Sequence, residues 1–152
     1  GATHRIIAEL IDLGVENTEI PTLLFDNSSF GRLQILGRAL QNMKVITEHK
    51  TAYTTLTQDE LNSFNYVKGD TEGIVNYGLS IKGIHFAAIF IENKEEKIIK
   101  ISFRSQGNFD VNQFARDHFQ GGGHQNAAGG KSEVSMEETI DKFEDLVTKL
   151  SI

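Results

Sequence analysis

Apolar residues at helical spacing dominate the first 43 residues of the chain. They predict a helix over residues 3–13, which Gly14 would end, and a second short helix over residues 19–25. A longer helix is expected after Ser29, with one apolar face that consists of Phe30, Leu33, Leu36, Leu40 and Met43. Helices without strands cannot bury these faces alone, so we expect the segment to pack on a further part of the protein.

From residue 44 onwards the pattern changes to that of strands. Residues rich in β-branched and aromatic side chains predict short strands over 45–47 and 51–57. The stretch IHFAAIFIEN, residues 84–93, is almost continuously apolar, which is typical of a strand covered on both faces in the centre of a sheet. A charged turn follows, and then apolar and polar residues alternate in a second strand that ends at Arg104 and Ser105.

Capping signals mark helices between and after these strands. Residues 57–60 and 135–138 have the form of a capping box, in which Thr or Ser is followed three residues later by Glu. Asp70 is expected to cap a helix that runs to residue 79, and Asp110 a helix that leads into a glycine-rich stretch. The pattern therefore predicts an α/β fold, a mixed β-sheet flanked by helices and preceded by a helical connecting segment.

Composition narrows the class of protein. A hydrophobic content of 39% over 152 residues suits a packed core, and the chain contains no cysteine. No apolar run is long enough to span a bilayer and no signal sequence is visible, so the expectation is a cytoplasmic protein without a membrane partner. The net charge of −6 argues against general duplex binding. Residues 97–131 nevertheless carry five basic and two acidic residues, a local charge of +3 that fits a small anionic ligand.

That basic segment contains the stretch GGGHQNAAGG, residues 121–130. Consecutive glycines permit positive φ angles and let a ligand approach the backbone, so their N–H groups can form a nest for an anion. His124 could donate to a phosphate, and Ala127 and Ala128 could open a helix whose N-terminus adds to the positive field. A plain turn is the alternative. The stretch is not a P-loop, because Gln125 stands where that motif needs a glycine.

Other signs of chemistry are scarce. The histidines are scattered, no HExxH pair occurs, and Ser105 lacks a nucleophile elbow. A hydrolase that works alone would need a metal-ligand set or a nucleophile with its base. The residues by themselves therefore indicate a binding domain.

The order FRS (103–105), VNQFA (111–115) and GGGHQNAAGG resembles the DHHA1 domain of DHH-family phosphoesterases, in particular the nanoRNase (oligoribonuclease) and pAp-phosphatase type. In that family an N-terminal DHH domain holds two Mn²⁺ ions and the DHHA1 domain closes over the substrate. No DHH triplet occurs here, so the resemblance implies residues 1–43 as the end of the catalytic domain with the interdomain linker, and residues 44–152 as the substrate-binding domain. Gln120 departs from the pattern, because many relatives have a further glycine there.

The resemblance also implies site roles. Arg104 would pair with a substrate phosphate, and the GGGH loop would offer N–H groups and the imidazole. The expected substrate-binding set is Arg104, Ser105, Gly121, Gly122, Gly123, His124, Asn126 and Ala127. No catalytic or metal-binding residue is expected in this chain, which should be inactive alone, with the Mn²⁺ ions in a DHH domain acting in cis.

The implied reaction of the larger protein is hydrolysis of short single-stranded oligoribonucleotides or of 3′,5′-bisphosphorylated nucleosides (pAp). Three alternatives stay open: part of a cyclic-dinucleotide phosphodiesterase, a stand-alone nucleic-acid-binding module, or a simple structural protein. A homodimer is also left open.

Overall fold

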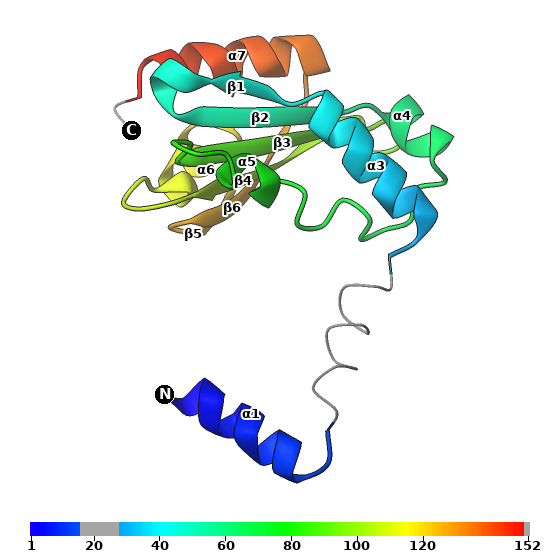
Figure 1. Ribbon diagram of the computed structural model, residues 1–152. Coiled ribbons are helices and arrows are strands. Elements are labelled where there is room, and N and C mark those ends of the chain that lie inside the picture. Colours follow the sequence, from blue (N-terminus) through cyan, green and yellow to red (C-terminus); the bar gives the residue numbers. More distant parts are fainter. Residues whose placement is uncertain (16–27, 151–152) are drawn as a thin grey trace. The chain divides into compact units, whose positions relative to one another are not determined.

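The computed structural model describes residues 1–15 and 28–150, and the chain divides into two units, residues 1–30 and 31–152 (Figure 1). In the first unit, helix α1 (Ala2–Asp12) confirms the helix predicted over 3–13, and none of its residues is buried. The helix predicted over 19–25 lies outside the described residues. The assignment of residues 1–43 to a preceding domain stays a prediction, although most of the helix that follows Ser29 belongs to the second unit.

The second unit is built on one mixed sheet of six strands in the order β1-β2-β3-β4-β6-β5 (Figure 1). β2 and β3 are parallel, and the other neighbours are antiparallel. The strands are β1 (Lys44–Ile46), β2 (Thr51–Leu56), β3 (Phe86–Asn93), β4 (Ile98–Ser105), β5 (Gly122–His124) and β6 (Ala127–Ser132). The apolar run over 84–93 thus forms a central strand, as predicted.

Helices pack on both faces of this sheet, which confirms the predicted fold class. Their bounds are α3 (Phe30–Gln41), the 3₁₀ turn η1 (Thr47–His49), α4 (Gln58–Ser63), α5 (Asn76–Leu79), α6 (Val111–His118) and α7 (Met136–Thr148). α6 and α7 share one apolar cluster with the sheet, whereas α3 and α4 share a second with the sheet's other face. In the described ranges no helix has the length and apolarity that crossing a membrane requires.

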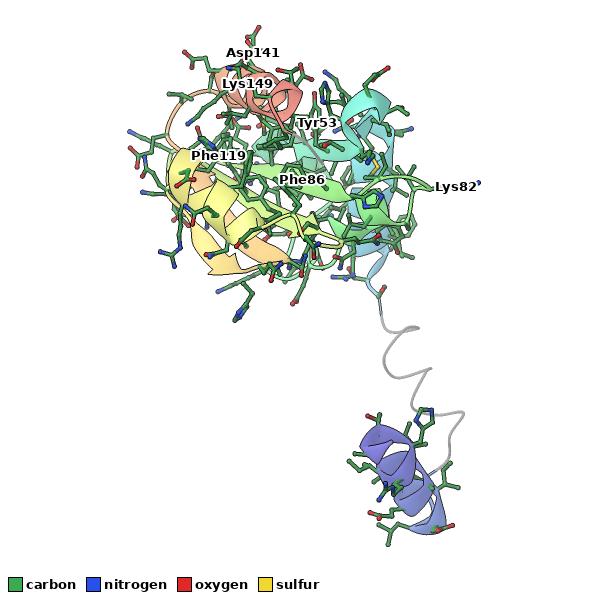
Figure 2. All side chains as sticks on the ribbon, turned by 90° about the vertical axis from the view of Figure 1, so that its left-hand side faces the viewer. Tyr53, Lys82, Phe86, Phe119, Asp141 and Lys149 are labelled. Carbon is green, nitrogen blue, oxygen red and sulfur yellow. The ribbon has the colours of Figure 1, made fainter. Side chains whose placement is uncertain are left out.

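The face under α6 and α7 is packed with aromatic rings. Phe86, Phe103 and Phe143 are fully buried, and the ring centroids of Phe86 and Phe143 lie 5.6 Å apart. Figure 2 labels Tyr53, Phe86 and Phe119 within this layer. Tyr53 donates a short hydrogen bond to Glu144, and burial together with that carboxylate raises the pKa of the phenol well above its usual value. The phenol is therefore protonated and satisfied inside an apolar layer.

α3 uses a different face from the one predicted. Ile35 and Ala39 are completely buried against the sheet, whereas Leu33 and Leu40 are about half exposed. Only Leu36 of the predicted face is packed against this cluster. The physical reason is that α3 has apolar residues on more than one side, so spacing alone does not show which side the sheet covers.

The predicted capping boxes are present at α4 and α7. At α4, burial opposes ionisation of Glu60, but hydrogen bonds from Thr57 and Asn42 outweigh it and lower the pKa of this carboxyl. The helix expected to begin at Asp70 begins only at Asn76, because Asp70 accepts a hydrogen bond from an earlier backbone amide and residues 69 and 73 are glycines with positive φ.

Candidate functional site

Strand register brings Arg104, Ala127 and His124 into one row at one edge of the sheet. Arg104 of β4 lies opposite Ala127 of β6, and Ala127 lies opposite His124 of the edge strand β5. Directly opposite residues of an antiparallel pair project from the same face. The two candidate ligand-binding side chains therefore share a face, with only a methyl group between them.

The row continues into the part of this face that the helices cover. Arg104 lies opposite Ala87 of β3, which lies opposite Ala52 of β2. α5 rests on these two alanines: a Cβ atom at Gly78 would lie 2.9 Å from the Cβ of Ala87. The buried cluster of this face takes its sheet residues from β2 and β3. Arg104 thus stands at the border of the covered half, and its Nη1 donates to Phe103 O at 2.9 Å. Apart from His124, the residues of β6 and β5 next to it are alanine and glycine.

The glycine-rich stretch forms a β-hairpin and not a helix N-terminus. The prediction that Ala127 and Ala128 open a helix is wrong, since both belong to β6. The amides of Gly121 and Gly123 donate to Ala115 O (3.1 Å) and Asn112 Oδ1 (2.9 Å). These two N–H groups are therefore used inside the fold, and an anion nest of the predicted kind does not form around them.

Two of the three leading glycines are required by close packing. A Cβ atom at Gly121 would lie 2.0 Å from Gly129 O, and one at Gly123 would lie 2.5 Å from Ala127 O. Gly122 differs, because a Cβ there would meet only the Arg116 guanidinium, at the ordinary distance of 3.5 Å. The hairpin thus explains Gly121 and Gly123 by its own geometry, whereas a Cβ at Gly122 would only come into van der Waals contact with Arg116.

Ser105 and Asn126 face away from the row and fix the hairpin to the end of β4. Ser105 follows Arg104 in the strand, so its side chain projects from the opposite face. Its hydroxyl donates to Phe109 O (2.7 Å) and accepts from Asn126 Nδ2 (2.9 Å). Asn126 Nδ2 also donates to Gly107 O (3.1 Å). The structure therefore gives these two predicted site residues a bracing position.

Asn112 and Arg116 of α6 complete this corner of the fold, and sequence reasoning did not select them as site residues. Asn112 Oδ1 accepts from Arg116 Nε at 3.0 Å as well as from the amide of Gly123. Their spacing of four residues on a helix was a visible signal for the pair. The contact with the hairpin was not, because it depends on how β5 folds back against α6.

Of the five basic residues in 97–131, Arg104 and Arg116 lie at this corner, whereas Lys97 belongs to the turn between β3 and β4. Lys100 pairs with Glu96 at 2.5 Å, and Lys131 pairs with Glu133 at 2.8 Å, so acids just outside that segment offset two of its cations. In the part of the chain that the structure describes, Arg104 and Arg116 form no ion pair with an acidic side chain. The positive potential of this corner thus comes mainly from them.

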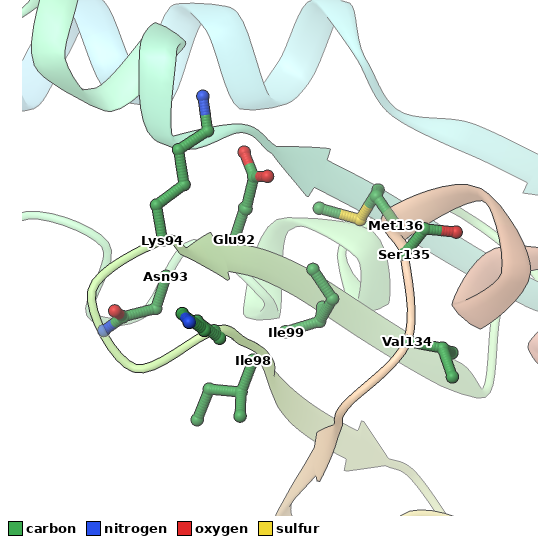
Figure 3. A pocket seen from close by; sticks show the side chains of 9 residues that line it. Glu92, Asn93, Lys94, Ile98, Ile99, Val134, Ser135 and Met136 are labelled. Carbon is green, nitrogen blue, oxygen red and sulfur yellow. The ribbon is translucent and has the colours of Figure 1, made fainter.

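A pocket of about 280 Å³ lies elsewhere, where the turn between β3 and β4 meets the start of α7 (Figure 3). Its lining includes Ile98, the first residue of β4, which is six residues from Arg104 and so about 20 Å away along the strand. Its polar lining is largely engaged: Glu92 accepts from the amide of Gln58, and Lys94 pairs with Asp59. This pocket is separate from the candidate site.

Most of the chain, including the sheet from β2 onwards, matches a known protein family. The DHHA1 domain matches residues 48–150, which includes Arg104, α6 and the whole hairpin. This chain belongs to the DHHA1 family. The match confirms the resemblance at the level of the domain, and not its narrower nanoRNase and pAp-phosphatase type.

Solved structures extend this comparison. An exopolyphosphatase-related protein from Bacteroides fragilis is 40% identical, with a TM-score of 0.91, over 97% of this chain and 43% of its own. PggH from Vibrio cholerae, a pGpG-specific phosphodiesterase, shares the fold with a TM-score of 0.56 and 14% identity, over 96% of this chain and 50% of its own. The DHHA1 chain therefore spans half or less of the length of these proteins.

Proposed function

We infer that this DHHA1 domain binds a phosphate group of a short oligoribonucleotide or of a 3′,5′-bisphosphorylated nucleoside, as the substrate-binding part of a DHH-family phosphoesterase. The observation that carries the proposal is the row of Arg104, Ala127 and His124. The planar guanidinium of Arg104 can donate two hydrogen bonds to the oxygens of one phosphate, and the imidazole of His124 supplies a further donor. The small side chain of Ala127 leaves room between them. A phosphate ligand also agrees with the names of the two similar structures, an exopolyphosphatase-related protein and a phosphodiesterase.

The two Mn²⁺ ions that the family implies do not fit this corner. Within the described ranges no three His, Cys, Asp or Glu side chains come together as a ligand set, and the site itself presents two cationic arginines. We therefore assign the domain the task of holding the phosphate in a fixed orientation. The hydrolytic step belongs to a DHH domain outside these 152 residues.

Titration calorimetry on the 152-residue chain tests the assignment, with adenosine 5′-monophosphate, pAp, pGpG, a trinucleotide and a long single-stranded RNA. Arg104→Ala and His124→Ala should each weaken binding of the preferred short ligand by about tenfold, which corresponds to about 1.4 kcal/mol. Lys82→Ala is the control, because Lys82 is an exposed cation that points away from the domain (Figure 2).

The outcomes separate the candidate functions. Preference for pGpG over the other short ligands would move the assignment to dinucleotide hydrolysis, and preference for long RNA would indicate a nucleic-acid-binding module. Equal binding by wild type, Arg104→Ala and Lys82→Ala would refute the site. Analysis of the ligand after the same titration shows whether the chain alone hydrolyses it. Turnover would overturn the assignment of binding to this domain and of hydrolysis to a DHH domain.

A further inference from the structure

We propose that two copies of this chain associate through the outward side of α3, about a two-fold axis, with Gly37 where the two helices cross. The proposal goes beyond the ligand site and does not depend on it. Three observations carry it: the outward side of α3 is apolar and uncharged, its central glycine is not required by packing inside the domain, and the order of its residues is self-complementary.

The outward side of α3 is apolar, although a surface helix normally turns polar residues to solvent (Figure 1). Leu33 and Leu40 are 53% and 44% exposed, and the exposed Gly37 lies between them in the second unit. Both charged residues of the helix are engaged by the domain: Arg32 donates to two backbone carbonyls of the segment before α5, and Arg38 lies 3.7 Å from a carboxylate of α4. The outward ridge itself therefore carries no charge, and a helix that is apolar on both sides is suited to being covered on both.

Gly37 is not required by packing inside the domain. Among the described residues no heavy atom would lie within 4 Å of a Cβ placed there, and Gly37 does not have a positive φ. Glycine in the middle of a helix destabilises it relative to alanine. A partner helix gives this glycine a function, because two helix axes come as close as about 8 Å only where the residues at the crossing are small.

The order of residues on the ridge favours a second copy of this chain as the partner. A two-fold axis at Gly37, perpendicular to α3, makes the two helices antiparallel and places the same surface on both sides of the contact. Leu33 of one copy then faces the region of Leu40 in the other, and the reverse, so apolar side chains meet apolar side chains. Because the ridge is uncharged, this contact forms without opposing like charges, although each copy has a net charge of −6.

The size of the ridge sets the strength of the association. A stable interface buries about 800 Å² on each partner. α3 has 12 residues and is therefore about 18 Å long, and only its outward side is free, so one helix crossing buries less than that area. We therefore expect a reversible dimer with a dissociation constant of about 10–100 μM.

Sedimentation velocity of the 152-residue chain from about 5 to 500 μM tests the proposal, and wild type should shift from monomer to dimer across this range. Leu33→Glu places an unpaired carboxylate in the apolar contact and should weaken association at least about tenfold. Gly37→Ala should also weaken it about tenfold by separating the helices. The same variant should raise the free energy of unfolding in urea, because alanine is the better helix former. Leu10→Glu, the same kind of change on the exposed apolar face of α1, is the matched control and should associate within about twofold of wild type.

Three results would overturn the proposal. If wild type stays monomeric at every concentration, the ridge does not join two copies and is left for a further domain of the larger protein. If Leu10→Glu abolishes association and Leu33→Glu does not, the copies associate through α1. If Gly37→Ala associates as strongly as wild type, the helices do not cross at this residue. Because Gly37→Ala is expected to be the more stable protein, its loss of association cannot come from unfolding.

Discussion

Gly121 shows how far the glycine cluster serves the fold. In the variant Gly121→Ala the new methyl group would lie 2.0 Å from Gly129 O and 2.7 Å from Gly130 Cα. Both contacts are with the backbone of the adjacent strand, so no side-chain rotation relieves them and the start of β5 must move away from β6. Overpacking of this kind costs about 1–3 kcal/mol. We expect about 2 kcal/mol, because the same movement strains the hydrogen bond from Gly121 N to Ala115 O.

Urea unfolding followed by far-UV circular dichroism measures this loss on the 152-residue chain. The matched control is Gly122→Ala, whose methyl group would meet only the exposed Arg116 side chain at 3.5 Å and should cost less than about 0.5 kcal/mol. A stability of Gly121→Ala equal to that of wild type would refute the packing argument. So would an equal loss in both variants, which would show that the hairpin tolerates no side chain for some other reason.

Two further predictions concern Glu60 and Gln120. Glu60→Gln should lower the free energy of unfolding by about 1 kcal/mol at pH 7. Because the fold lowers the pKa of Glu60, the carboxylate stabilises the protein above the usual pKa of 4.5, and this stabilisation is lost as pH falls below it. Urea unfolding should therefore show a smaller difference between wild type and variant at pH 3 than at pH 7, and a difference independent of pH would contradict the assignment. Gln120→Gly should raise the thermal unfolding midpoint by a few degrees. Gln120 has a φ of 47°, and glycine adopts this region without the steric cost of a Cβ. An unchanged or lower midpoint in a calorimetric scan would count against this prediction.

The parts of the fold with a strong local signal could be predicted from sequence. The apolar run of β3 is visible because a strand covered on both faces has apolar residues throughout, and the alternation in β4 is visible because apolar and polar side chains point to opposite faces. The capping boxes at Thr57 and Ser135 depend on residues only three apart and are equally local. The sheet order was not predictable in this way, because it depends on pairing between distant segments.

What sequence could not show depends on tertiary contacts. Ala127 and Ala128 suit a helix by propensity, yet pairing with β4 on one side and β5 on the other makes them part of a strand. The glycines were assigned to ligand binding because the close approach of Gly121 to Gly129 O appears only once the hairpin is formed. Arg116 was overlooked for the same reason. Of the predicted site, Arg104, Ala127 and His124 come together in one row, and their role in binding stays a prediction.

The turn between β5 and β6 consists of two residues, Gln125 and Asn126, and this length sets which way His124 faces. An insertion of one residue that shifted β5 by one position against β6 would place His124 on the opposite side of the sheet from Arg104. The amino acids of the turn can therefore change more freely than its length. A library that randomises Gln125 should retain ligand binding in many clones, whereas single-residue insertions beside it should abolish binding even in clones that fold.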